Sequence, residues 1–215
     1  MSMLVDFIDQ GWAAFSNVTT ADDLLRLARS IGQPVPNNRG ELISSLNIVP
    51  RNDARPRTLS ANYGQASFPL HTDTAFWPLP AKFRVMRVEG DLRRTTTICP
   101  IDALIRDAGS DLKKLIETSV WIVKENRSSF YRKMKLRIRS ESLGIRYDRQ
   151  CMIPANDQAK QLDKFFENHA SSSVVGQIEW SADTAVVISN WRTLHGRGSQ
   201  PIDEARRTLQ RIYVR

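Results

Sequence analysis

The chain has 215 residues, of which 41% are hydrophobic and 25% are charged, and its formal net charge is +8. This length and composition predict one domain over residues 1–215 with a sizeable core, and no segment approaches the ~20 uninterrupted apolar residues of a membrane span. The N-terminus lacks the pattern of a secretory signal, and Cys99 and Cys151 are too few for a disulfide scaffold, so we expect a soluble cytoplasmic protein with reduced thiols.

The first predicted helix lies within residues 19–34, TTADDLLRLARSIGQP. Thr20 and Asp23 have the spacing of a capping box, and Gly32 is a typical residue for a helix end. Between them runs an apolar stripe with helical spacing, formed by Leu24, Leu27, Ala28 and Ile31.

A histidine and an aspartate lie two residues apart in PLHTDTAFWPLP, residues 69–80. In an extended segment, residues i and i+2 share a face, so His71 and Asp73 can converge on one point. A single such pair is more often a turn hydrogen bond than a metal site, so a third ligand is required.

The middle of the chain alternates strand-like and short helical segments. Runs rich in β-branched and aromatic residues predict strands within 82–90, 94–100 and 119–125, and short helical turns are expected within 101–109 and 111–119. In residues 131–139, YRKMKLRIR, the period of two predicts a strand with one apolar face and one cationic face. A solvated edge strand and an anion-binding face both fit the cationic residues Lys133, Lys135, Arg137 and Arg139.

The C-terminal part contains a second helix, within 156–170, and strands within 176–181, 184–191 and 207–215. Leu162, Phe165 and Phe166 are predicted to face inward from this helix, and His169 at its end is assigned to the helix dipole. The irregular spacing of the strands, without βαβ alternation, favours a mainly antiparallel sandwich or jelly roll with flanking helices.

The third histidine, His195, follows the apolar strand predicted at 184–191 and begins the polar turn HGRGSQP. Two histidines and one carboxylate form the facial triad that leaves positions open on Fe(II) for oxygen chemistry. Arg207 and Arg211 come next and share a face of the last predicted strand, where a guanidinium can hold a carboxylate with two hydrogen bonds.

With these motifs in this order, the sequence resembles the taurine dioxygenase and clavaminate synthase-like family of Fe(II)/2-oxoglutarate-dependent dioxygenases. The resemblance implies a double-stranded β-helix core, a jelly roll of the cupin type. It also implies that Fe(II) is bound by His71, Asp73 and His195, and that 2-oxoglutarate is the cosubstrate.

The resemblance implies further roles around the iron. Arg207 matches the arginine that binds the distal carboxylate of 2-oxoglutarate, with Arg206 as a solvent-facing neighbour. Thr97, with Thr95 as the alternative, matches a threonine that contacts the same carboxylate. Arg211 matches a second arginine near the keto-acid end of the cosubstrate or an anionic substrate. Asn190 and Arg192 match supporting residues before the last histidine.

The residues that flank the His-x-Asp pair are candidates for the substrate pocket. Trp77, Phe76 and Phe68 either wall the pocket or belong to ordinary core packing. Because Asp73 retains its carboxylate, the resemblance implies hydroxylation or desaturation of an unactivated C–H bond, whereas halogenating relatives lose this ligand.

The positive charge favours an anionic or zwitterionic small-molecule substrate, such as an amino acid or another carboxylate of specialised metabolism, either free or bound to an acidic carrier protein. A second subunit is a further candidate partner, because the chain is compact for the family. Two alternatives remain: a nucleic-acid demethylase with the same iron chemistry, which lacks a convincing base-flipping loop, and a non-catalytic jelly-roll binding module.

Overall fold

The fold is described from a computed structural model of the chain. It describes residues 11–47, 51–54, 59–64, 66–89, 95–125, 127–138, 143–168, 176–198 and 208–215. Within these residues, no helix is both long and apolar enough to cross a membrane.

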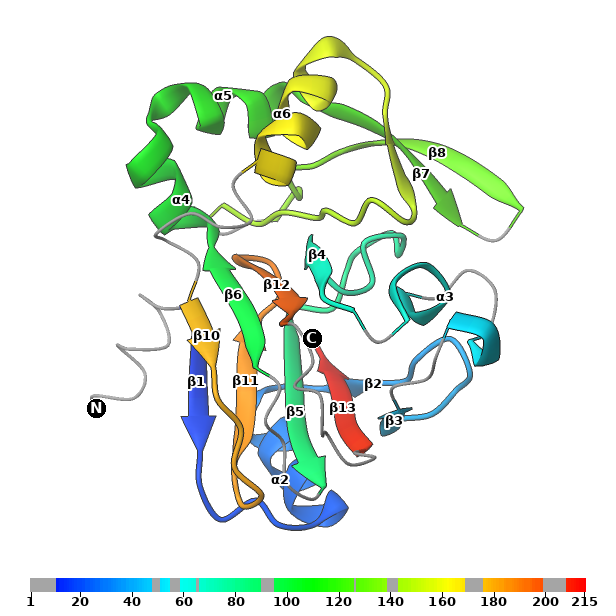
Figure 1. Cartoon of the computed structure of the whole chain (residues 1–215), viewed down its shortest axis with the longest axis vertical. Helices are drawn as coiled ribbons and strands as arrows, with labels where there is room; N and C mark the ends of the chain where they lie inside the picture. The colour runs from blue at the N-terminus through cyan, green and yellow to red at the C-terminus, as the bar shows by residue number, and fades with distance from the viewer. Residues whose placement is uncertain are drawn as a thin grey trace.

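Two antiparallel sheets form the centre of the structure (Figure 1). The first sheet has the order β1-β11-β5-β13-β2, and β3 also pairs with β13. Its strands are β1 (Trp12–Phe15), β2 (Pro34–Val35), β3 (Ser44–Asn47), β5 (Phe83–Glu89), β11 (Ala185–Ser189) and β13 (Thr208–Val214). The second sheet has the order β10-β6-β12-β4. Its strands are β4 (Phe68–His71), β6 (Thr96–Pro100), β10 (Gly176–Ile178) and β12 (Thr193–Arg197).

The two sheets pack face to face over an apolar interior. Met86 and Val88 of β5 contact the same buried cluster as Ile98 of β6 and Ile178 of β10. Because side chains alternate along a strand, the odd-numbered neighbours on β5 point to the opposite side. The described strands therefore form the antiparallel jelly-roll core that the sequence predicts.

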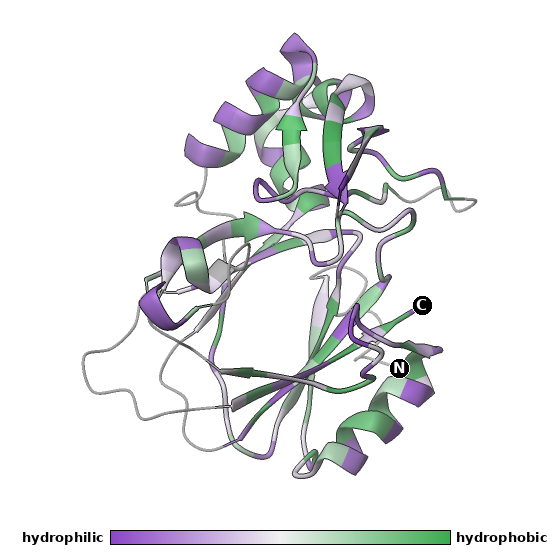
Figure 2. Ribbon diagram, turned by 90° about the vertical axis from the view of Figure 1, so that its right-hand side faces the viewer, coloured by the Kyte–Doolittle hydropathy of each residue, from purple (hydrophilic) through white to green (hydrophobic). Residues whose placement is uncertain are grey.

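Helix α2 (Ala21–Ile31) covers the outer face of the first sheet. Thr20 accepts a hydrogen bond from the backbone of Asp23, and Asp23 returns one to the backbone of Thr20, so the predicted capping box is present. Leu24 and Ala28 are fully buried against Val85 and Ile212. In Figure 2 this helix presents apolar residues to the sheet and polar residues outward.

A second layer lies beyond the other sheet and contains helices α4 (Ile101–Ala108), α5 (Ser110–Thr118) and α6 (Asp157–Asn168). The layer also contains a small sheet, in the order β8-β7-β9, made of β7 (Val120–Glu125), β8 (Ser128–Lys133) and β9 (Met152–Pro154). Leu162 and Phe166 are buried in its core and Phe165 packs against it, as predicted. A short helical segment, η1 (Arg51–Asp53) with α3 (Leu59–Tyr63), precedes β4.

The basic stretch only partly matches its predicted strand. Met134 and Leu136 are buried, whereas Lys133, Lys135 and Arg137 are exposed, so the predicted alternation of faces is present. Strand β8 nevertheless ends at Lys133, and beyond it only an isolated bridge joins Lys135 to Ile145. The fourth cation of the stretch, Arg139, and the helix-terminal His169 lie outside the described residues.

Candidate metal site

Three predicted metal ligands meet at one edge of the second sheet. His71 is the last residue of β4, Asp73 follows in the turn, and His195 lies in the middle of β12. Strands β4 and β12 pair antiparallel with His71 directly opposite His195, so the strand register places the two imidazoles side by side. Their ring centroids are 4.6 Å apart.

The ligand atoms of these residues lie within 4.8 Å of one another. Nε2 of His71 is 3.8 Å from Oδ1 of Asp73, and Nε2 of His195 is 3.7 Å from Oδ2 of the same carboxylate. The three residues are 3%, 8% and 1% exposed, respectively. Two imidazole nitrogens and one carboxylate thus converge on a point where a divalent cation can bind.

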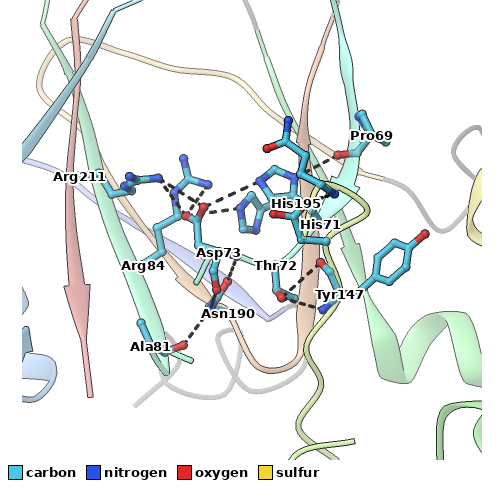
Figure 3. Close-up of polar contacts among 12 residues, drawn as sticks. Pro69, His71, Thr72, Asp73, Ala81, Arg84, Tyr147, Asn190, His195 and Arg211 are labelled. Atoms are coloured by element: carbon cyan, nitrogen blue, oxygen red, sulfur yellow. Dashed lines mark hydrogen bonds and ion pairs between the residues drawn. The ribbon is translucent and has the colours of Figure 1, made fainter. Parts of the chain in front are cut away.

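Hydrogen bonds outside the triad fix the orientation of its members. Nδ1 of His71 is 3.0 Å from the carbonyl oxygen of Pro69, which can only accept, so Nδ1 donates and Nε2 is left to face Asp73. The side-chain oxygen of Asn190 accepts from the backbone N–H of Asp73 at 2.8 Å, and its amide nitrogen donates to the carbonyl oxygens of Asp73 and Ala81. Figure 3 shows this amide holding the turn that carries Asp73.

His195 provides a test of whether a metal fits the site. Neither of its ring nitrogens has a hydrogen-bond partner among the described residues, although both are buried. Burial and the nearby Arg84 guanidinium lower the pKa of His195 well below its usual value, so the imidazole is neutral at pH 7. A buried neutral imidazole with an unused nitrogen is costly in isolation and suited to a metal ligand. The donor set therefore fits a divalent metal such as Fe(II).

Two arginines from the facing sheet contact the carboxylate of the triad. Nη1 of Arg84, on β5, is 3.0 Å from Oδ2 of Asp73, and Nη1 of Arg211, on β13, is 3.3 Å from each oxygen. Burial alone would raise the pKa of Asp73, but the two guanidinium groups outweigh it and hold this pKa well below its usual value. Figure 3 shows the guanidinium groups on one side of the carboxylate and the imidazoles on the other.

Of the residues predicted to bind 2-oxoglutarate, Arg211 and Thr97 lie within the described residues. Arg211 faces the triad, where its Nη1 contacts Asp73. Arg207, proposed for the distal carboxylate of 2-oxoglutarate, and its neighbour Arg206 precede β13 and lie outside the described residues.

Thr97 is on β6, but the structure does not bring it to the triad. Its hydroxyl lies 2.6 Å from the position that a Cβ on Gly196 would occupy, and Thr95 lies equally close to the corresponding position on Gly198. Ile98 pairs directly with His195, so alternation places Thr96 on the face of His195 and Thr97 on the opposite face. Thr96 is thus the threonine on the inner side of this strand, where its hydroxyl accepts from Nε1 of Trp180 at 3.1 Å.

The aromatic residues near the His-x-Asp pair have separate environments. Trp77 donates to Asn38 and packs edge-on against Tyr213 at 5.7 Å, and the guanidinium of Arg211 lies 4.5 Å from the ring centroid of Tyr213. The ring of Phe68 is 5.5 Å from that of His71. Phe76 instead packs against the apolar core of the helical layer, which is the position expected if this residue serves core packing.

Arg192 forms an ion pair with Asp102 on α4, and so ties the turn between β11 and β12 to the helical layer. This contact agrees with the supporting role expected for it.

Arg84 and Tyr213 belong to the site although the sequence reasoning did not single them out. They are directly paired across β5 and β13 and face the interior. A signal for Arg84 was present: it has the same parity as Met86 and Val88, so alternation places an arginine in an apolar row.

Sequence comparison finds no matching family model and no matching curated protein. Comparison of structures does find similar proteins. PvcB from Pseudomonas aeruginosa is 18% identical with a TM-score of 0.70, and the match covers 97% of this chain and 77% of that one. The non-heme iron oxygenase OrfP, solved with Fe and alpha-ketoglutaric acid, is 16% identical with a TM-score of 0.72, over 99% and 78% of the two chains.

An asparagine oxygenase, solved with Fe(II), 3-hydroxyasparagine and succinate, is 15% identical with a TM-score of 0.73, over 99% of this chain and 77% of that one. The similarity extends over nearly the whole chain, whereas identity is low. The chain therefore has the fold of the iron- and 2-oxoglutarate-dependent oxygenases that its sequence motifs resemble. Within that fold, His71, Asp73 and His195 lie close enough together to hold a metal ion.

Proposed function

We propose that this chain is an Fe(II)- and 2-oxoglutarate-dependent oxygenase that acts on an unactivated C–H bond of a carboxylated small molecule. The observation that carries the proposal is the buried triad, in which His195 has two unpartnered ring nitrogens among the described residues and Asp73 is kept ionised by arginines. A non-catalytic binding module has no need for this combination. The similar structures solved with iron and 2-oxoglutarate or succinate support the same chemistry.

The overall reaction in the hydroxylating case balances simply. One molecule of oxygen and one of 2-oxoglutarate are consumed with the substrate, and succinate, carbon dioxide and an alcohol are formed. Iron, when bound, supplies the oxygen activation that no protein side chain can provide. The protein must bind the partners, orient them and exclude water.

Each group of residues has a part in that task. His71, Asp73 and His195 hold the metal. Arg207, which follows the triad in sequence, is proposed to bind the distal carboxylate of 2-oxoglutarate with two hydrogen bonds. Arg211 faces Asp73 and is proposed to contact a carboxylate next to the metal, and Trp77 is proposed to shield that region from water.

An amino acid is the leading substrate class. OrfP has been solved with hydroxylated arginine and the asparagine oxygenase with hydroxyasparagine, so this fold accommodates amino acids next to iron. In the present chain the guanidinium groups beside the triad supply positive charge for a carboxylate. We propose a free amino acid or similar carboxylate of specialised metabolism as substrate, oxidised in the cytoplasm.

Succinate release tests the proposal. The purified chain is incubated with Fe(II), 2-oxoglutarate and oxygen, and a panel of free amino acids, short peptides and carrier-bound amino acids is added. We expect substrate-stimulated succinate release that is lost in His71→Ala. No stimulation by any member, together with no binding of Fe(II), would favour the binding module instead.

A carrier-bound substrate is the second candidate because of the surface of the small sheet. Lys133, Lys135 and Arg137 are exposed around one groove. On the same face of β8 as Lys133, Tyr131 is 74% exposed. Ile153 is 41% exposed, and both Tyr131 and Ile153 pair with Ile122 from opposite sides. Exposed apolar residues next to cations suit an acidic carrier protein.

A further inference from the structure

Arg84 is a buried arginine whose surroundings differ from those of a purely structural residue. Its side chain points from β5 into the space between the sheets, is only 10% exposed, and contacts Asp73 of the triad at 3.0 Å. Its Nε is buried and has no hydrogen-bond partner among the described residues. The same is true of Nε of Arg211, the second arginine on this carboxylate. Both guanidinium groups thus have donors to spare.

Arg87 on the same strand provides the contrast. It is also buried, at 5% exposure, but points to the outer face of the sheet. There it donates to Gln210 through Nε, to the carbonyl oxygen of Thr19 through Nη1 and to Glu89 through Nη2. All three nitrogens are used, as expected of an arginine that serves only the fold.

Positively charged groups outnumber negatively charged groups beside the triad. Arg84 and Arg211 bring two guanidinium groups to the single carboxylate of Asp73. A divalent metal at the triad shares the same carboxylate and adds two more positive charges. Like charges held close together in a poorly solvated site repel one another, and a further anion beside the metal offsets this repulsion.

We propose that Arg84, together with Arg211, binds a carboxylate next to the metal, and that this pairing makes the affinity of the triad for a divalent metal depend on that carboxylate. The inference rests on the proposed function and adds a residue and a coupling to it. Either the keto-acid carboxylate of 2-oxoglutarate or the carboxylate of the substrate has the required chemistry.

The physical consequence is reciprocal coupling. A metal that binds alone must draw Asp73 away from two guanidinium groups and accept their repulsion. A carboxylate that binds with it occupies the spare donors and offsets the charge. Linkage then requires that each ligand raises the affinity of the other by the same factor.

Metal binding measured without turnover tests this proposal. Mn(II), which cannot support oxidation but binds the same donors, is titrated by calorimetry into the parent chain, Arg84→Gln and the matched control Arg87→Gln. Each titration is made with and without saturating 2-oxoglutarate. Chelation by the keto acid raises the metal affinity in all three proteins, so the informative quantity is the difference in this rise between proteins.

We expect Arg84→Gln to bind Mn(II) alone at least as tightly as the parent, because one competing cation is gone. The rise in affinity caused by 2-oxoglutarate should shrink by about tenfold, which corresponds to ~1.4 kcal/mol. Arg87→Gln should keep the full rise. An unchanged rise in folded Arg84→Gln, checked by circular dichroism, would contradict the proposal for the cosubstrate carboxylate.

A second arm separates the two sources of the carboxylate. Free amino acids from the panel are titrated into each protein loaded with Mn(II) and 2-oxoglutarate. A loss of amino-acid affinity in Arg84→Gln, with an unchanged effect of 2-oxoglutarate, assigns the contact to the substrate. If neither ligand is affected, Arg84 is not an anion-binding residue.

If Arg84→Gln does not fold, the proposal can still be tested, and refuted, with the parent chain alone. Acetate carries a carboxylate without a keto group, and in solution it competes for the metal. We expect moderate acetate to raise the Mn(II) affinity of the parent, whereas chloride at equal ionic strength should not, and the absence of this rise would overturn the proposal. If the parent binds Mn(II) and releases succinate but shows no coupling, this proposal fails and the proposed function stands. If the parent binds no metal, the proposed function itself is refuted.

Discussion

At the scale of single residues, the candidate metal site is the feature on which the proposed activity should depend most. His71→Ala should sharply weaken Fe(II) binding and abolish succinate release, because one of three ligand atoms is removed. The fold should survive, since the residue lies at the end of β4 and the surrounding sheets retain their apolar interior. Anaerobic calorimetry with Fe(II), together with thermal unfolding, measures both effects.

The control for this variant is His169→Ala, which removes the histidine assigned to a helix end. We expect parent-like iron binding from it. If His71→Ala binds Fe(II) as tightly as the parent, the triad is assigned incorrectly.

Arg207 carries the second prediction at this scale. Arg207→Ala should raise the apparent KM for 2-oxoglutarate far more than it changes Fe(II) affinity, because a charge-assisted contact to a carboxylate contributes ~1.5–3 kcal/mol. Steady-state kinetics with varied 2-oxoglutarate measure the effect. Arg206→Ala is the adjacent control, and a defect confined to this control would shift the cosubstrate contact by one residue.

The sequence was informative about single site residues where the residue type is rare in the chain. With only three histidines in the chain, a His-x-Asp pair and a histidine after an apolar strand leave few choices for a metal site. Arg84 was missed for the opposite reason. Lysine and arginine together number 31, so one more arginine in a strand attracts no notice until the facing strand places it on Asp73.

At the scale of elements, local patterns correctly predicted α2, α4, α5 and α6 and strands such as β5, β7 and β11, but not α3, β1 or β3. The polar turn expected to begin at His195 was wrong, because this residue lies within strand β12. The capping box of α2 and the apolar runs of β5 and β11 depend on neighbours in sequence, which the sequence displays directly. The sequence did not determine which side chains of β6 face the interior. Three consecutive threonines fit either alternation, and only the pairing of Ile98 with His195 decides which of them faces inward.

This choice of face gives the third prediction. Thr96→Val should raise the KM for 2-oxoglutarate by up to about tenfold, because its hydroxyl accepts from Trp180 and retains a proton to donate to a carboxylate. Thr97→Val should leave the KM near the parent value, since that hydroxyl lies against Gly196 on the opposite face. Kinetics of the two isosteric variants measure the difference. A defect in Thr97→Val with a silent Thr96→Val would restore the original assignment.

At the scale of the whole molecule, the pairing of distant strands creates the site. Strand β13 pairs with β5, and β12 with β4, so residues more than 100 positions apart meet at Asp73. Hydrophobic patterning predicts that strands exist but carries little information on which strands pair. The jelly-roll class was predictable from the spacing of the strands and from the family resemblance, whereas the guanidinium groups that face the triad were not.

The surface charge gives the last prediction, on the form in which the substrate arrives. Reversing Lys133→Glu and Lys135→Glu together changes a cationic surface of the helical layer, apart from the triad. The loss of the ion pair between Lys135 and Glu117 should cost little stability, because both groups are exposed. For a free amino acid, turnover should scarcely change at any ionic strength, since its contacts are confined to the pocket.

A carrier-bound substrate responds differently, because docking of an acidic protein depends on longer-range attraction that salt screens. The reversed variant should then associate more slowly than the parent, and its rate should depend less on salt. Arg26→Glu with Arg29→Glu on α2 is the matched control, which changes the net charge equally on the other side of the sheets. Turnover of free and carrier-bound substrates is measured against ionic strength for all three proteins. If a neutral apolar molecule is the best substrate at every salt concentration, the preference for an anionic substrate is refuted, and the charge of +8 serves only as a solubilising surface.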